Sequence, residues 1–385
     1  MSQIRILHLT GDYPDPVRKP TTQAIKHTID HLPQFEHVVI SLDRTPNPTK
    51  TYWKDCGTIG QAHVFAHGQW GLPFGIGLHT SFYLAAKKIW KEMNATGFKP
   101  DIIHAHRLTF DGIAASLLAR WWNVPFVLSV RGEVESKVFR FKPFYRSLLK
   151  RMVNDAGAIY YVSLWFRKDL QRFTNVNEDK ERPFPNIVLN TAKTIRPIPP
   201  TRGFVSIFNF AIYKKKGLEG LLPAFKAACE REPNITLDLI GQATPQQLEI
   251  IQELIDSHGL SDKVKAIGPL PHQEVVKRLP TYQALLLPSH NETFGMVYTE
   301  ALFAGIPVLY SAGNGIDGFL DEIDVGVRID PNDTNAICEG IIHLNDNNQS
   351  LRLSISDNGN ELYARFNPNF HLERYEADIR RLVSK

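Results

Sequence analysis

The chain has 385 residues and a net charge of +4, with 43% hydrophobic and 22% charged residues, which is typical of a globular protein with two domains. No window offers about 18 uninterrupted apolar residues, and the N-terminal MSQIRILHLTGDYP lacks the pattern of a signal peptide, so neither a spanning helix nor secretion is predicted. The three cysteines, Cys56, Cys229 and Cys338, are isolated, which argues against a disulfide framework or a cysteine metal site and favours the cytoplasm.

The two halves of the chain differ in charge. Residues 1–196 contain 27 Lys and Arg against 16 Asp and Glu, a net charge of +11, whereas the remainder contains 17 against 24, a net charge of −7. A basic first half predicts an anionic partner for that half, either a membrane, a lipid phosphate or nucleic acid.

Strands and helices are predicted to alternate through the first half. The predicted strands are residues 4–9, 37–42, 63–66, 102–105, 126–130, 159–162 and 187–189, and the clearest predicted helices are 78–93, 111–122 and 144–154. This alternation predicts a doubly wound parallel sheet. The proline-rich segment 194–203 can continue neither kind of element, so it is predicted to link two domains.

The alternation restarts after this linker. Predicted strands at 204–210, 236–240, 264–267, 284–287 and 308–310 are separated by predicted helices at 218–230, 245–258 and 294–304. Further helices are predicted at 334–343 and 351–365, and Pro368 then interrupts the chain before a last helix at 370–383. The second half therefore predicts a second doubly wound domain.

The turn between the strand at 284–287 and the helix at 294–304 carries the most informative pattern, SHNETFG. Glu292 precedes the helix, and Glu300 lies about one and a half turns into it. Free N–H groups at the helix N-terminus suit an anion such as a diphosphate, and a carboxylate can accept paired hydrogen bonds from a vicinal diol. The amides concerned are those of Phe294, Gly295, Met296 and Val297. The alternative interpretation is an ordinary strand–helix–strand unit in which Glu292 caps the helix and Glu300 is solvated.

The segment PSHNETFGMVYTEALFAGIPVLYS resembles the E-x7-E signature of the retaining glycosyltransferases of family 4, which have the GT-B fold. That signature is preceded by PS and followed by EA, a small residue, G and PV, all of which are present. The resemblance covers most of the chain, most densely residues 204–331. It implies an α/β protein of two Rossmann-like doubly wound domains that face a cleft, with a C-terminal helix that crosses back to the first domain.

The resemblance also assigns the parts of the chain. It implies an acceptor-side domain at residues 1–193, the linker at 194–203, a nucleotide-sugar domain at 204–366 and the crossing helix at 367–385. Within the second domain, Glu300 would hold the ribose hydroxyls, and Glu292 would contact the donor sugar as a catalytic residue. Lys216 would hold the diphosphate together with the helix amides, beside Thr293.

The glycines and cations predicted near this donor site match the family pattern less closely than the segment around Glu292 does. Gly241 and Gly268, which end two predicted strands, match family positions that border the nucleotide, and each is also an ordinary strand-ending turn. Lys216 resembles the lysine of the family's KG step, and the alternative for three successive lysines is a solvated loop. The family usually has an arginine shortly before that lysine, where this chain has Ala211, so Lys214, Lys215 or Arg131 would have to replace it.

Three residues of the first half resemble family positions in the cleft. Gly11 follows the first strand and would lie near the diphosphate, and Arg131 occupies a place where the family often has HG or RG. His106, at the end of the strand at 102–105, would contact the donor sugar or help to place the acceptor in a catalytic role. His104 lies deeper in the same strand by alternation, so it is predicted to be structural.

A run of cations and aromatics at residues 137–151 contains no acid. Its six cations are Lys137, Arg140, Lys142, Arg146, Lys150 and Arg151. Interleaved basic and aromatic residues suit an anionic membrane surface, so peripheral contact with the inner face of the membrane is predicted. The alternative is a helix with inward aromatics and solvated charges.

These observations predict a metal-independent glycosyltransferase without a cofactor, which takes a UDP, GDP or ADP sugar as donor. The resemblance implies a retaining front-face mechanism. The predicted acceptor is a lipid-linked or cell-envelope saccharide, and no nucleic-acid partner is expected. Two alternatives stay open, a nucleotide-sugar epimerase on the same fold and a non-catalytic basic binding protein. A dinucleotide oxidoreductase is disfavoured because LTGDYP after the first strand lacks G-x-G-x-x-G.

Overall fold

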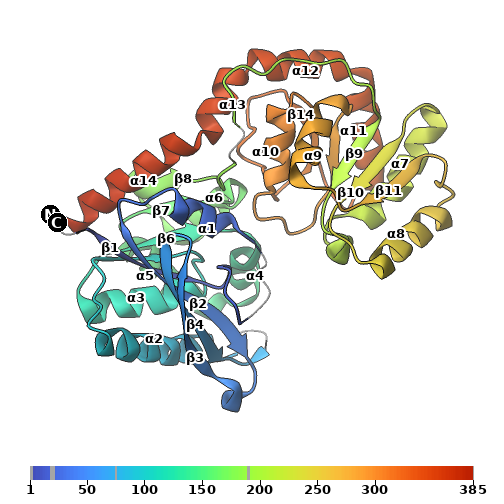
Figure 1. The fold of residues 1–385 in the computed structure, drawn as a ribbon. Helices are drawn as coiled ribbons and strands as arrows, with labels where there is room; N and C mark the ends of the chain where they lie inside the picture. The colour runs from blue at the N-terminus through green and yellow to red at the C-terminus, as the bar shows by residue number, and fades with distance from the viewer. Residues whose placement is uncertain (1–2, 18–21, 74–75, 189–190, 385) are drawn as a thin grey trace. The chain divides into compact units, whose positions relative to one another are not determined.

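The computed structural model describes residues 3–17, 22–73, 76–188 and 191–384, and the chain forms two compact units (Figure 1). The first unit comprises Met1–Val162, Phe166–Ile187 and Pro368–Lys385, and the second comprises Ser163–Trp165 and Val188–Asn367. Each unit is built around its own β-sheet, and the predicted doubly wound α/β architecture is confirmed.

The sheet of the first unit has eight strands in the order β3-β4-β2-β1-β5-β6-β7-β8. The strands are β1 (Arg5–Thr10), β2 (Glu36–Thr45), β3 (Tyr52–Ile59), β4 (Ala62–Trp70), β5 (Ile102–Ala105), β6 (Phe126–Val130), β7 (Ile159–Tyr161) and β8 (Glu181–Pro183). All neighbours are parallel except β3 and β4, which form an antiparallel hairpin at one edge. Strands β1, β5 and β6 are almost wholly buried, as expected for parallel strands covered by helices on both faces.

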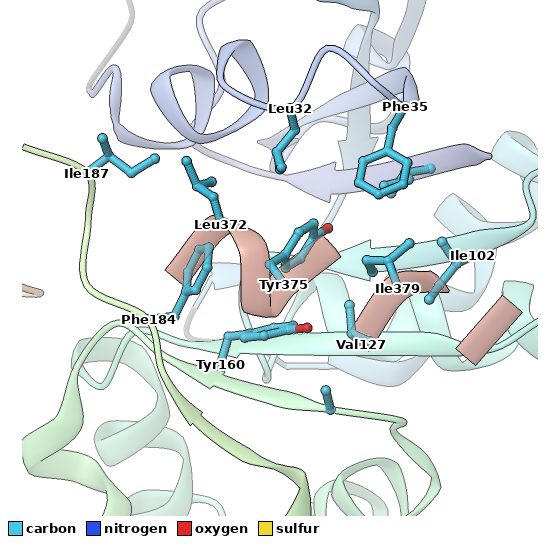
Figure 2. Close-up of a cluster of buried hydrophobic side chains, with 12 residues drawn as sticks. Leu32, Phe35, Ile102, Val127, Tyr160, Phe184, Ile187, Leu372, Tyr375 and Ile379 are labelled. Atoms are coloured by element: carbon cyan, nitrogen blue, oxygen red, sulfur yellow. The ribbon is translucent and has the colours of Figure 1, made fainter. Parts of the chain in front are cut away.

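The helices of the first unit come from both ends of the chain. They are α1 (Ala24–Asp30), α2 (Leu78–Ala95), α3 (Asp111–Trp122), α4 (Glu133–Phe141), α5 (Arg146–Asp155), α6 (Arg167–Thr174) and α14 (Pro368–Val383). Leu372, Tyr375 and Ile379 of α14 join a buried cluster with side chains of β1, β5 and β6 (Figure 2). The C-terminal helix therefore belongs to the core of the first unit.

The sheet of the second unit has six parallel strands in the order β11-β10-β9-β12-β13-β14. They are β9 (Phe204–Ile207), β10 (Leu237–Ile240), β11 (Val264–Gly268), β12 (Leu285–Leu287), β13 (Val308–Ser311) and β14 (Gly326–Ile329). Its helices are α7 (Leu218–Arg231), α8 (Pro245–Ser257), α9 (His272–Arg278), α10 (Met296–Phe303), α11 (Thr334–Asp346), α12 (Asn348–Asp357) and α13 (Gly359–Phe366).

Both sheets reverse their strand order at one point. In the first unit this switch point lies between β1 and β5, and in the second it lies between β9 and β12. Doubly wound sheets bind ligands beyond the carboxyl ends of the strands at such a point, because the two following helices leave on opposite faces of the sheet. The residues after these four strands are therefore placed where a ligand would bind.

The predicted elements differ from the structure in a few places. The strand predicted at 187–189 is absent at the two described positions. Strand β8 forms a few residues earlier and ends at Pro183, and Pro185, which follows it, has no N–H to donate to a ladder. Leu189 lies outside the described residues. The hairpin strand β3 was not predicted, since Lys54, Asp55 and Gly57 interrupt its apolar pattern. The helix predicted at 351–365 is divided into α12 and α13. No helix within the described part of the chain is both long and apolar enough to span a membrane.

Candidate active site

The turn before α7 packs directly against the end of β12. Gly217 caps α7 with a φ of 77°, and a Cβ there would lie 1.9 Å from the carbonyl oxygen of Pro288. The backbone N–H of His290 also donates to the carbonyl oxygen of Lys215 at 2.8 Å. Because only glycine permits this approach, the turn after β9 and the turn after β12 are held side by side at the switch point.

This packing brings Lys216 to Glu292, although the two residues are 76 positions apart. Their side chains form an ion pair and are only 16% and 14% exposed. Partial burial strengthens the attraction between the two charges relative to a surface pair. An anion bound beside Lys216 would compete with Glu292 for the ammonium group, which would leave the Glu292 carboxylate available to hydroxyl groups.

The N-terminus of α10 lies at the same turn. Gly295 caps the helix with a φ of 74°, so the first helical amides are those of Met296 and Val297. The helix therefore begins two residues later than predicted. Phe294 lies before the helix, with its ring fully buried against Phe319 at 5.5 Å between centroids. The N–H of Tyr298 already donates to the carbonyl oxygen of Gly295, so the N–H groups of Met296 and Val297 are the first-turn donors without a backbone acceptor among the described residues.

Glu300 lies one turn further along α10 and contacts a histidine that the sequence reasoning missed. Its carboxylate lies 3.2 Å from Nε2 of His272, the first residue of α9. The Glu300 side chain is 19% exposed, whereas that of His272 is 65% exposed. A carboxylate held from one side and open on the other is suited to accepting hydrogen bonds from a diol. His272 follows the Gly268-Pro269-Leu270-Pro271 loop, which was the available sequence signal for this position.

The two predicted glycines Gly241 and Gly268 lie at the carboxyl ends of β10 and β11. The N–H of Gly241 donates to the carbonyl oxygen of Gly268 at 2.9 Å. A Cβ on Gly241 would lie 1.6 Å from the carbonyl oxygen of Phe208, so this position excludes any larger residue. Both glycines therefore shape the same edge of the sheet as the turn that holds Glu292.

The loop after β13 supports Glu292 from a third direction. The N–H of Gly315 donates to the carbonyl oxygen of Glu292 at 2.9 Å. The N–H of Gly313 donates to the Asp317 carboxylate at 2.6 Å, and that carboxylate is held in turn by Arg328. The backbone of the Glu292 turn is thus fixed by neighbours that are distant in sequence.

A chain of buried histidines lies at the switch point of the first unit. Nδ1 of His8 lies 3.0 Å from Nε2 of His106, and Nε2 of His8 lies 2.9 Å from Nδ1 of His37. This series of hydrogen bonds ends where Nε2 of His37 lies 2.8 Å from the carbonyl oxygen of Leu32. Burial lowers the pKa of each of the three imidazoles, well below the usual 6.5 for His8 and His106, so all three are neutral at pH 7.

The carbonyl oxygen at the end of this chain fixes every tautomer. Because a carbonyl only accepts, His37 donates from Nε2 and accepts at Nδ1, so His8 must donate from Nε2. His8 then accepts at Nδ1, and His106 must donate from Nε2. Nδ1 of His106 consequently carries a lone pair, which suits a hydrogen bond from a hydroxyl group.

His104 has a structural environment, as predicted from its depth in β5. Its ring nitrogens lie 3.0 Å from the hydroxyl of Tyr375 on α14 and 2.8 Å from the hydroxyl of Ser129, and burial lowers its pKa to about 3. Its ring also stacks on that of His106, with centroids 3.9 Å apart. Tyr375 of the C-terminal helix therefore holds His104 in place, and His104 in turn packs against the ring of His106.

The imidazole rings of His8, His104 and His106 form the one group of potential metal ligands found among the described residues. Nitrogen atoms of His8, His104 and His106 lie within 4.8 Å of one another, and all three side chains are buried. Both nitrogens of His8 and both nitrogens of His104 already have hydrogen-bond partners. A metal ion would have to displace these bonds, so the geometry favours a hydrogen-bond network.

Arg131 belongs to a buried charged cluster beneath His106. Its Nε donates to the carbonyl oxygen of His106 at 3.1 Å, and burial lowers the pKa of its guanidinium. Arg107, which was not predicted, forms an ion pair with Asp12 at 2.5 Å. The carboxyl groups of Asp111 and Glu135 complete the cluster, and burial raises the pKa of both. These groups come from three loops and two helices, so no short motif marks them.

Two family comparisons match almost the whole chain between them. Residues 24–188 match Glycosyltransferase Family 4, and residues 195–362 match the glycosyl transferases group 1. The chain belongs to the family 4 glycosyltransferases.

Individual relatives of this glycosyltransferase are distant. A D-inositol 3-phosphate glycosyltransferase of Corynebacterium diphtheriae is 26% identical over 260 residues, which is 60% of each chain. Sucrose-phosphate synthase of Thermosynechococcus elongatus has the same fold, with a TM-score of 0.72, 18% identity, and 99% and 100% of the two chains covered. Anabaena Alr3699/HepE in complex with UDP gives a TM-score of 0.66 at 15% identity, with coverage of 99% and 100%. These likenesses show the GT-B fold.

The predicted donor residues of the glycosyltransferase fall into two groups. Glu292, Thr293, Gly295, Met296 and Val297 share the turn after β12, where Lys216 joins them. Lys215 contributes its backbone there. The neighbouring Lys214 pairs instead with Glu219 at 3.2 Å, on the exposed face of α7.

Gly11 and Arg131, the two donor residues predicted from the first half of the chain, lie in the first unit. Gly11 follows β1 and lies beside Arg107, since a Cβ on Gly11 would lie 3.4 Å from a guanidinium nitrogen. Arg131 has its Nε directed at the carbonyl oxygen of His106. The replacement of the family arginine at Ala211 by Arg131 or Lys215 stays a prediction, whereas the exposed ion pair of Lys214 with Glu219 argues against Lys214.

The predicted membrane-contact run forms α4, a 3₁₀ turn at Pro143–Tyr145, and α5. Phe139 is buried, as in the alternative interpretation, but Phe141 and Phe144 are each 69% exposed. Arg146 is engaged by the protein, because its guanidinium donates to the carbonyl oxygen of Phe139 and lies over the ring of Phe173. Two of the predicted cations lie over exposed aromatic rings, Arg140 over Phe141 at 5.3 Å and Lys142 over Phe144 at 6.0 Å.

Proposed function

We propose that this family 4 glycosyltransferase transfers a sugar from a nucleotide-diphosphate sugar to a hydroxyl acceptor with retention of configuration. The observation that carries the proposal is the convergence of Lys216, Glu292 and the N-terminus of α10 at one switch point. A cation and free amides recognise a diphosphate. Two carboxylates, Glu292 in the turn before α10 and Glu300 on α10, recognise hydroxyl groups. The complex of the structural neighbour HepE with UDP supports a nucleotide donor.

The chemistry asks the protein chiefly to stabilise a departing diphosphate. The bond between the anomeric carbon and the diphosphate oxygen breaks while the acceptor oxygen bonds to that carbon on the same face. The acceptor proton passes to the departing phosphate oxygen. Negative charge builds on the diphosphate, where Lys216 and the amides of Met296 and Val297 would counter it without a metal ion.

Glu292 and His106 would act on the sugar. Once the ammonium of Lys216 turns to the diphosphate, the Glu292 carboxylate can accept hydrogen bonds from sugar hydroxyls and oppose the positive charge that develops on the ring. The lone pair on Nδ1 of His106 would accept a further sugar hydroxyl. Glu300, already held by His272, would accept the two ribose hydroxyls.

The acceptor side is proposed to meet an anionic membrane surface. The first half of the chain is strongly basic, and the exposed Phe141 and Phe144 are flanked by Arg140 and Lys142. Apolar rings that enter the lipid boundary beside cations that meet phosphates are the pattern of a peripheral membrane protein. This surface supports a lipid-linked acceptor made for the cell envelope.

The donor site is tested by comparing two neighbouring lysines. Binding of UDP, GDP and ADP sugars to the wild-type protein, to Lys216→Ala and to Lys214→Ala should be measured by calorimetry and thermal shift. Loss of a charge-assisted contact should weaken the preferred nucleotide sugar about 10- to 100-fold in Lys216→Ala. Lys214→Ala removes an equally basic residue that pairs with Glu219 and should bind like the wild type.

The same panel separates the alternatives. Binding of no nucleotide sugar by the wild type, or equal weakening by both lysine variants, would refute the proposed donor site. An epimerase would convert the donor in the absence of any acceptor. A non-catalytic binding protein would be indifferent to Glu292→Gln, whereas a transferase should lose about 100-fold in turnover.

A further inference from the structure

The first unit contains a cavity of about 760 Å³ at the carboxyl ends of its central strands. This volume falls within the range of sites that enclose small molecules. Its walls come from the ends of β2 and β4 and from α2, α3 and α4, and they are mostly apolar. The principal apolar side chains are those of Leu42, Leu78, Phe82, Phe110, Val138 and Phe141.

One part of the cavity is polar. It is lined by Gly11, Arg107 and Asp111, which follow β1 and β5 at the same sheet edge as His106. Asp111 is 2% exposed, and its Oδ2 has no hydrogen-bond partner among the described residues. An unpartnered buried carboxyl oxygen is costly unless a ligand satisfies it, so this side chain points to a hydroxyl-bearing ligand.

The protonation state of Asp111 agrees with a hydroxyl partner. Burial raises its pKa to about 8, against the opposing effect of the Arg107 guanidinium and with additional repulsion from Asp12 and Glu135. The carboxyl group is therefore mostly protonated at pH 7. A protonated carboxyl can both donate to and accept from a hydroxyl group, and it offers no charge to attract a cation.

The charged residues of the lining favour an anion elsewhere on the ligand. Arg44, Lys137 and Lys142 line the cavity, while Asp43 is the only acid there besides Asp111 among the described residues. Lys137 is held loosely by Glu133 at 3.7 Å, and both of these side chains lie near the protein surface. An apolar wall with a cationic surround complements an amphipathic molecule that carries a phosphate.

The lining is continuous with the surface proposed to meet the membrane. Lys137, Phe141 and Lys142 line the cavity and also belong to the basic and aromatic run at residues 137–151, which begins on α4. Phe141 and Ile76, which lines the cavity from the segment before α2, are 69% and 60% exposed. The apolar interior of the cavity thus opens beside exposed apolar side chains that suit an acyl or prenyl chain.

We propose that this cavity binds the acceptor, and that the acceptor is a membrane lipid with a phosphate and a free hydroxyl in its head group. The inference rests on the proposed glycosyl transfer and adds the class of acceptor and its site. The hydroxyl lies against Asp111, the phosphate lies near the lysines and arginines of the lining, and the hydrocarbon follows the apolar wall toward Ile76 and Phe141.

A short-chain phosphatidylglycerol tests this site because it has acyl chains, a phosphate and free hydroxyls. Dioctanoyl phosphatidylglycerol below its micelle concentration should bind the full-length protein in calorimetry. Ile76→Glu places a carboxylate at an exposed lining position and should weaken this binding at least about tenfold. Ile250→Glu, at a residue that is 45% exposed on α8, is the matched control and should bind like the wild type.

Two further probe molecules identify which part of the lipid is recognised. Glycerol 3-phosphate, which lacks the chains, should bind at least about a hundredfold more weakly. Dioctanoyl phosphatidylmethanol, which keeps the same anionic phosphodiester but lacks a free hydroxyl, should also bind more weakly, and Asp111→Ala should abolish the difference between the two lipids. Equal binding of glycerol 3-phosphate would overturn the lipid assignment in favour of a soluble phosphorylated acceptor, and no binding of any probe would overturn the site.

Nucleotide-sugar binding, measured on the same variants, separates this inference from the proposed function. Ile76→Glu should bind the donor like the wild type, which also shows that the variant is folded. Lipid binding without any donor binding would remove the proposed function and leave the lipid site. Donor binding without lipid binding would remove only the lipid site.

Discussion

Replacement of Asp111 by Asn should stabilise the protein, and increasingly so as the pH rises. The pKa of Asp111 is about 8 in the folded protein against a usual 3.8. The folded state therefore keeps a proton that the unfolded chain loses between these two values, so the free energy of unfolding falls as the pH increases. The difference of roughly four pKa units corresponds to a cost on the order of 5 kcal/mol at pH 8, or about 1.4 kcal/mol for each pH unit.

Asparagine has nearly the same shape and does not ionise, so Asp111→Asn removes this cost. In calorimetry, the gap between the melting temperatures of Asp111→Asn and wild type should widen by several degrees between about pH 5 and pH 8. Asp155→Asn changes a half-exposed aspartate at the end of α5 and should show a gap that does not vary in this way. A gap for Asp111→Asn that stays constant or narrows with rising pH would show that Asp111 is ionised in the folded state.

Three other predictions concern the second unit. Gly217→Ala would force a Cβ against the Pro288 carbonyl and should cost at least about 2 kcal/mol by calorimetry, whereas Gly259→Ala, with a similar φ of 68° and no atom within 4 Å, should cost about 1 kcal/mol. Arg352→Met removes a buried guanidinium that donates to several backbone carbonyls, and should lower the free energy of unfolding by about 3 kcal/mol; no change in the melting temperature would contradict this structural role. Glu300→Gln should raise the KM for the nucleotide sugar about tenfold while kcat changes little, and an unchanged KM would exclude Glu300 from the donor site.

The motif around Glu292 could be predicted from the sequence because its parts are close together in the chain. A buried strand, a polar turn and a helix N-terminus lie within 28 residues, and the periodicity of the apolar residues marks each of them. The doubly wound sheets were predictable for the same reason, since each strand and helix is a local pattern. The start of α10 was misplaced because Phe294 is apolar and fits a helical pattern, although its ring packs into the core before the helix begins.

The side-chain contacts of these residues could not be predicted from the sequence. Glu300 meets His272 through an approach of α9 to α10, and the side chain of His272 is exposed, so nothing in its own neighbourhood indicated a role. The exposure of Phe141 beside the burial of Phe139 depends on how α4 packs, and the sequence left open whether the aromatics of this run face a membrane or pack inward.

The sequence by itself determined the fold class, the position of the turn at Glu292 and the basic character of the first half, because these follow from local apolar periods and from composition. Only the tertiary structure decided that Lys216 pairs with Glu292 and that His37 and His8 fix the tautomer of His106. It alone also decided that Oδ2 of Asp111, in the polar part of a mostly apolar cavity, has no hydrogen-bond partner among the described residues. Each of these depends on strand order. Neighbouring strands in a doubly wound sheet come from distant parts of the chain, and their carboxyl ends meet only when the sheet has formed.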